Sequence, residues 1–210
     1  ETKPNTASNK SKPIFKNPLK ELFKVFKEEK IKKLSLAFFI YFIAFTGLTN
    51  ILIFFLQESL NWTTKASSGT LVVVGVIAII VQGGLIGPLV KQFGEMRLTL
   101  IGLGFIFVAC SLLITSPKEN ATINIYSAVS FLAVGAGLIT PTLRALISKK
   151  LEVNKQGSIL SNLQGLQSLG GVLGIAMAGR VYDSFGPKSP FIAGSVILLF
   201  MIYLIAEGKS

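Results

Sequence analysis

Six long apolar runs, separated by short polar links, constrain this chain more than any other feature of its sequence. An apolar run of about 18 residues or more is long enough to cross the hydrocarbon core of a bilayer as a helix. The runs of this kind lie at residues 34–56, 70–90, 98–115, 123–147, 157–179 and 189–206. The sequence therefore predicts an all-α membrane protein with six transmembrane helices.

The predicted spans leave little of the 210 residues for a further domain, and only 15% of the chain is charged. We expect residues 1–33 to form a cytoplasmic linker, residues 34–206 the six-helix bundle and residues 207–210 a cytoplasmic tail. Within the linker, apolar residues recur at helical spacing opposite lysines, after a capping Asn and a Pro. The pattern predicts a basic amphipathic helix on the membrane surface, formed around Asn17, Pro18, Leu19, Leu22, Phe23 and Phe26.

The net charge of +11 follows the membrane rather than a nucleic acid. Ten of the 21 Lys and Arg residues lie in residues 1–33, and six of the other eleven lie in the second and fourth links or, for Arg144, at the adjoining end of the fourth span. Cytoplasmic loops carry an excess of Lys and Arg. We therefore expect both termini in the cytoplasm of a plasma membrane or a bacterial-type inner membrane, with the lipid bilayer and no nucleic acid as partner.

Residue usage disfavours an enzyme. The chain contains no His, which excludes a Ser/His protease, a His-ligated zinc site and a His-held haem. Its one cysteine, Cys110, lies inside an apolar run, where a small packing residue is expected. We expect no catalytic residue, no metal and no cofactor.

The link after the second span carries a recognisable pattern at residues 87–97. Gly87, Gly94 and Arg97 fit the G-x-x-x-D-[RK]-x-G-x-[RK]-[RK] loop of the major facilitator superfamily, which the segment resembles. Lys91 stands where the family has Asp, so the resemblance implies a gating turn here without the family's charge relay. The alternative is a simple basic turn at the membrane interface.

Further segments are similar to the tetracycline-efflux branch of proton-coupled drug antiporters, namely 61–62, 81–83, 137–143, 156–158 and 164–165. That family folds as two six-helix halves. The resemblance implies the C-terminal half of a twelve-helix transporter, with an N-terminal half as partner. It further implies proton-coupled efflux of a drug-like small molecule by alternating access. Two alternatives stay open, a major-facilitator carrier of a metabolite and a six-helix scaffold that transports nothing.

Polar residues inside the predicted spans are candidates for the substrate cavity, since each needs a partner or a wet surface. The family pattern places the first, second, fourth and fifth spans of a half around that cavity. The candidates on these spans are Thr46, Asn50, Gln82, Thr140, Gln164 and Gln167. The alternative is hydrogen bonding between helices, worth about 0.6 kcal/mol each.

Three other features of the spans lead to specific expectations. Pro141 interrupts the fourth span and is either a hinge or a residue that only shapes the bundle. Arg144 is either an anchor at the cytoplasmic interface or a charge at the cavity mouth. Gly170, Gly174 and Ala178 form a small-residue face, which we expect to pack against the other half.

No Asp, Glu or His lies within the six predicted spans. Proton coupling needs a group in the membrane that can change its protonation state. If the intact protein is an antiporter, we expect that group in the N-terminal half.

Overall fold

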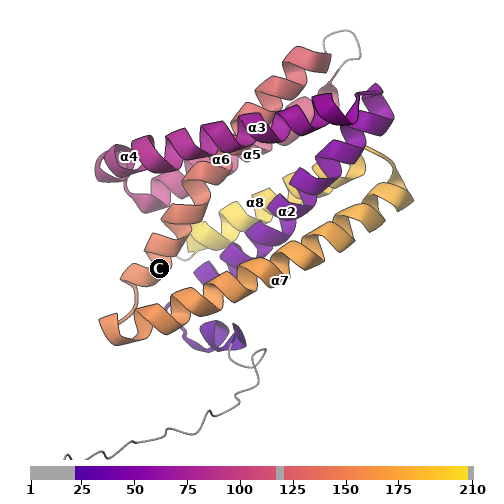
Figure 1. Ribbon diagram of the computed structural model, residues 1–210. Helices are drawn as coiled ribbons and strands as arrows, with labels where there is room; N and C mark the ends of the chain where they lie inside the picture. Colours follow the sequence, from indigo (N-terminus) through magenta and orange to yellow (C-terminus); the bar gives the residue numbers. More distant parts are fainter. Residues whose placement is uncertain (1–21, 117–120, 208–210) are drawn as a thin grey trace, which may run out of the picture.

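The computed structural model describes residues 22–116 and 121–207, and these fold into six long helices without a β-strand. They are α2 (Lys32–Leu60), α3 (Thr64–Ile80), which continues through the π-helix η2 (Val81–Leu85) into α4 (Ile86–Phe93), α5 (Glu95–Thr115), α6 (Ala121–Lys149), α7 (Val153–Phe185) and α8 (Ser189–Glu207). Figure 1 shows them as one bundle of long helices. The prediction of an all-α, six-helix architecture is confirmed.

Every predicted span lies within one of these helices, and most of the helices extend beyond the apolar run at one or both ends. The reason is that backbone hydrogen bonding continues past the point where apolar side chains stop. Five of the helices in the described part are long and apolar enough to cross a membrane. The sixth, α7, has 33 residues and so spans about 50 Å, but polar residues lower its hydropathy.

The linker differs from its prediction where the structure describes it. Residues Phe23–Lys27 form a short 3-10 helix, η1, followed by a turn before α2 begins. Val25 is fully buried against the bundle, whereas Phe23 remains 44% exposed. Leu22 and Phe26 of the expected apolar face do pack against the bundle, so the prediction is wrong only in placing Phe23 there and in leaving out Val25. Contacts of this segment with α2 and α7 select Val25 instead. Asn17, Pro18 and Leu19 lie outside the described residues.

The bundle consists of two units of three long helices, α2 to α5 and α6 to α8, where α3, η2 and α4 count as one helix. The first unit begins at one end of the bundle and the second unit begins at the opposite end. In each unit the first helix packs on the second and third helices of the other unit: α2 packs on α7 and α8, and α6 packs on α3 and α5. Figure 1 shows α3–α4 and α7 along opposite edges of the bundle, with α2 and α6 between them. Such inverted repeats characterise several transporter folds. We call the end that holds the first residues of α2 and α7 and the α4–α5 turn the tail end.

Glycines set the closest helix contacts. A Cβ on Gly174 would overlap the carbonyl oxygen of Ile43, and a Cβ on Gly170 would lie 3.2 Å from the carbonyl oxygen of Phe39. Both glycines are buried against α2. The expectation that this small-residue face packs against another half is therefore wrong, because α2 of the same bundle already occupies it.

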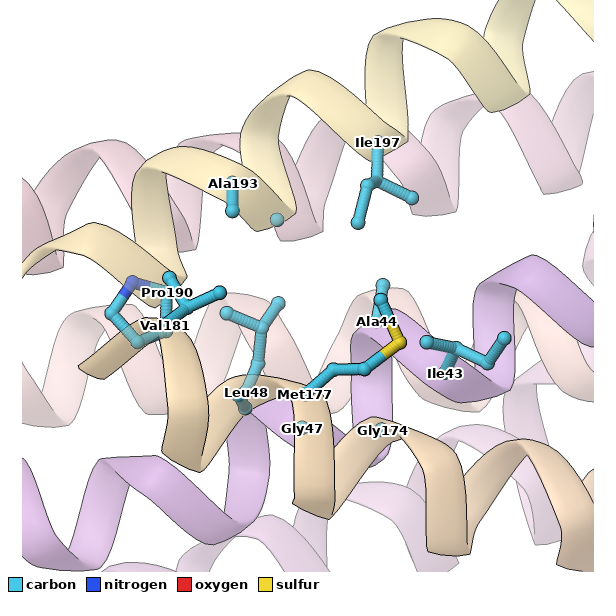
Figure 2. A pocket seen from close by; sticks show the side chains of 12 residues that line it. Ile43, Ala44, Gly47, Leu48, Gly174, Met177, Val181, Pro190, Ala193 and Ile197 are labelled. Carbon is cyan, nitrogen blue, oxygen red and sulfur yellow. The ribbon is translucent and has the colours of Figure 1, made fainter. Parts of the chain in front are cut away.

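The same small residues border an apolar hollow between α2, α7 and α8. Figure 2 shows Ile43 and Leu48 of α2, Met177 of α7 and Ile197 of α8 around it. No charged side chain lines this hollow. The hollow therefore offers no polar side chain to a ligand.

The edge formed by α3 has a face that the described residues leave open. Five of its large apolar side chains are more than 40% exposed, namely Leu71, Val72, Val76, Ile79 and Ile80. In a membrane such a face contacts lipid or another apolar protein surface.

Candidate substrate-binding surface

The most distinctive polar cluster joins α6 to α7 through Arg144. Its Nη2 atom donates hydrogen bonds to Oε1 of Gln164 at 2.6 Å and to Oε1 of Gln167 at 2.5 Å. Arg144 and Gln167 are half-buried, and Gln164 is exposed. One guanidinium therefore bridges two of the residues that the sequence nominated for the cavity.

Helix geometry explains why Arg144 reaches these glutamines. Side chains on an α-helix lean toward its N-terminus. Since α6 ends at the tail end, this lean carries the guanidinium away from that end and into the bundle. On α7, the residue at the same distance from the tail end as Arg144 is near position 158. Gln164 is six residues further along α7 and therefore lies about 9 Å further from the tail end. The geometry disfavours the interfacial anchor for Arg144, because its guanidinium points into the bundle toward Gln164 and Gln167.

An aromatic residue of α2, Phe38, lies against this cluster. The guanidinium carbon of Arg144 lies 5.8 Å from the ring centre of Phe38, within cation–π range. Tyr41, one turn further along, is fully buried, and its hydroxyl lies near Thr140 without a hydrogen bond of ordinary geometry. Thr140 is thus close to the cluster, on the same helix as Arg144.

The polar residues of α2 lie on the side of that helix that meets α7, nearer the middle of the bundle. Thr46 is half-buried, and its side-chain atoms lie 3.6–3.7 Å from where a Cβ on Gly171 would stand. The Asn50 amide is exposed and donates to the carbonyl oxygen of Thr46 at 2.9 Å. Within the described residues the amide oxygen of Asn50 has no donor, and it lies on an exposed surface of a predicted span, which is unfavourable against lipid.

Gln82 lies apart from the Arg144 cluster. It is exposed in the π-helix η2 and borders a hollow with Ala78, Ile79 and Gly83. One-turn π-helices inside α-helices occur frequently at functional sites. The neighbouring residue Val81 packs closely on Gly137 of α6, so η2 forms a close contact between the α3–α4 helix and α6.

The residues proposed for gating gather at the tail end. Gly94 joins α4 to α5 with φ of +75°, a conformation that favours glycine. Gly87 and Pro141 border one hollow between α4 and α6, and Arg97 is exposed. Nearby, Lys149 of α6 forms an ion pair with Glu95 at 2.5 Å, which ties the α4–α5 turn to the end of α6.

The structure thus brings Gln164 and Gln167 together on Arg144, with Thr140 one turn away on α6, and it places Thr46 and Asn50 next to each other on α2. It does not bring Gln82 into either group. Sequence reasoning did not find the contact of Phe38 with Arg144, because an aromatic residue in an apolar run carries no signal that distinguishes it from ordinary packing. Arg144 did carry a signal, a positive charge inside a predicted span.

The chain belongs to the Major Facilitator Superfamily, whose family model matches residues 1–175. Together with the apolar helices, this membership makes it an integral membrane protein of a transporter family.

Several tetracycline resistance proteins are among its relatives, which confirms the resemblance found from sequence. The class H protein of Pasteurella multocida is 29% identical over 133 residues, covering 63% of this chain and 32% of that protein. Human hippocampus abundant transcript-like protein 1 is 22% identical over 212 residues, covering 90% of this chain and 41% of that protein. The chain spans less than half the length of either relative.

A solved structure has the same fold. The human organic anion transporter MFSD10 matches with a TM-score of 0.78 at 19% identity, over 90% of this chain and 46% of that chain. At this identity the match establishes the fold alone.

Proposed function

We propose that this chain is the C-terminal half of a secondary transporter that exports drug-like small molecules in exchange for protons, by alternating access. One observation carries the proposal: Asn50 and Gln164 are exposed on α2 and α7 at membrane depth. Polar side chains there are expensive against lipid, so they favour a surface that faces water or substrate. In this proposal they line a cavity shared with an N-terminal half.

The similarity to tetracycline resistance proteins supports drug-like cargo and export. Proton coupling rests on the same similarity, since every Asp and Glu of this chain lies outside the predicted spans. The proton-binding group of the proposed antiporter therefore belongs to the N-terminal half. Organic anions are a second candidate cargo class, favoured by the positive charge of Arg144.

The test is export from everted vesicles that contain the whole transporter. Tetracycline and ethidium uptake are followed with an imposed proton gradient, and again after a protonophore collapses it. The proposal expects uptake of at least one compound that stops when the gradient is lost. Uptake that continues after the gradient is lost would favour a metabolite carrier. No uptake of any compound tried would favour the scaffold alternative.

We expect Asn50→Leu and Gln164→Leu each to lower this uptake severalfold without loss of expression. Each substitution removes a polar group from the proposed cavity surface, while Leu remains compatible with a membrane helix. Thr115→Leu is the matched control, because Thr115 is exposed on α5 and its hydroxyl donates, among the described residues, to the carbonyl oxygen of Ser111 on the same helix. Parental uptake by both cavity variants would mean that these residues serve only packing.

We also expect the tail end to be cytoplasmic. A cysteine at the exposed position Asn154 should then resist an impermeant thiol reagent added to intact cells, and one at Lys65 should react. Cys110 contributes little background, because it is fully buried. Labelling at position 154 from outside would reverse the proposed orientation.

A further inference from the structure

The guanidinium of Arg144 has hydrogen-bonding capacity that the described residues do not use. Arginine carries five N–H donors, and both of its hydrogen bonds here come from Nη2. Nε is buried without a partner. Nη1 makes no hydrogen bond within residues 22–116 and 121–207, so three donors remain.

The partners of Arg144 also leave its positive charge without a negative counterpart. Both are amide oxygens, which are neutral, and no carboxylate of the described residues forms an ion pair with it. A charge held at membrane depth is costly unless an opposite charge compensates it. Arg144 therefore has a place for an anion.

The surroundings add further donors rather than acceptors. Each of the two glutamines presents its Oε1 atom to Arg144, which leaves its side-chain N–H groups without an acceptor among the described residues. Since Gln164 is exposed, these donors border the open surface. An arrangement of guanidinium and amide donors fits a planar carboxylate, which can accept two parallel hydrogen bonds.

We infer that Arg144, Gln164 and Gln167 form the anion-binding subsite of the cavity, and that it takes the carboxylate of a soluble organic anion. This inference rests on the proposed function and specifies its substrate class. The anion accepts hydrogen bonds from donors that the described residues leave unused, those of Nη1 and of the glutamine amides, while Gln164 and Gln167 keep their bonds to Nη2. It thereby supplies the opposite charge that the neutral partners of the guanidinium lack.

The experiment compares two dyes with one ring system, fluorescein, which is anionic, and rhodamine 123, which is a cationic ester. Binding of each to the whole purified protein is measured by fluorescence anisotropy in phosphatidylcholine nanodiscs. The variants are Arg144→Gln and Arg144→Lys. Arg180→Gln is the matched control, because Arg180 is exposed on α7 outside this cluster.

Arg144→Gln should weaken fluorescein binding about tenfold or more, the effect expected for losing hydrogen bonds to a charged group. Arg144→Lys should retain part of the affinity, since it keeps the charge without the planar fork. The affinity of Arg144→Gln for rhodamine 123 should change less than about twofold. The affinity of Arg180→Gln for fluorescein should also change less than about twofold, which is less than half of the effect of one hydrogen bond on binding free energy.

Three results would overturn the subsite. They are no fluorescein binding by the parent protein, unchanged fluorescein binding by Arg144→Gln, and equal loss of both dyes. The last would mean that Arg144 supports the fold or pairs with a carboxylate of the other half. Fluorescein binding that depends on Arg144, in a protein that transports no compound, would preserve the subsite and refute the proposed function instead.

Discussion

Reconstituted alone in liposomes, this chain is expected to show no proton-driven uptake or efflux. The reason is chemical: none of its carboxylates lies within the predicted spans, and it has no histidine, so it carries no group to couple a proton to cargo in the membrane. In addition, the exposed apolar face of α3 and the open surface around Gln164 lack the opposing surface that a closed cavity needs. Activity should appear only when the N-terminal half is co-expressed.

The measurement is substrate-dependent pH change inside the liposomes, with three preparations: this chain, its N-terminal partner half, and both together. The two single halves act as controls for each other. Proton flux linked to substrate through liposomes that hold this chain alone would contradict the half-transporter proposal. It would favour an oligomer of this chain that builds a complete cavity by itself.

Gly174→Leu is expected to prevent normal folding, and Gly174→Ala to destabilise the protein by about 1–3 kcal/mol, the usual cost of overfilling a packed contact. The added Cβ would overlap the carbonyl oxygen of Ile43, and backbone atoms cannot move aside as a side chain can. α2 and α7 would have to separate, although their contact is among the most extensive in the bundle. The melting temperature of the purified protein measures the loss, at roughly 2–4 °C per kcal/mol.

Gly179→Ala is the matched control for this variant. Gly179 lies on the same helix, and a Cβ there would meet nothing within 4 Å. Alanine is favoured over glycine in a helix by up to about 1 kcal/mol, so this variant should be as stable as the parent or slightly more stable. If Gly174→Ala had the same melting temperature as Gly179→Ala, the close approach of α2 and α7 would not be a source of stability.

The candidate site was only partly predictable. Thr140, Gln164 and Gln167 could be nominated because a polar residue in an apolar run stands out without any structure. The role of Arg144 could not be chosen from sequence, since an anchor and a cavity charge differ only in where the side chain points. The direction of α6 and its distance from α7 decide this, and both are properties of the packed bundle.

Glycine faces show the same limit. The spacing of Gly170 and Gly174 correctly indicated a close helix contact, but the partner was assigned to another half when it is α2. A pattern on one helix defines a complementary surface without naming the helix that fills it. The π-helix at Val81–Leu85 is a similar case, because its two glycines permit the wider turn without requiring it.

The sequence by itself determined the number of long helices and their approximate limits, because the length and order of apolar runs are local properties that a bilayer converts directly into spans. It also indicated the family, through the motif at residues 87–97 and the segments that resemble the tetracycline-efflux branch. Only the tertiary structure decided which helices touch, that Val25 rather than Phe23 is buried, and that Arg144 binds Gln164 and Gln167. The physical reason is that inside a membrane apolar residues are equally suited to lipid and to protein. Helix partners are therefore chosen by shape and by a few polar contacts, which form only after packing.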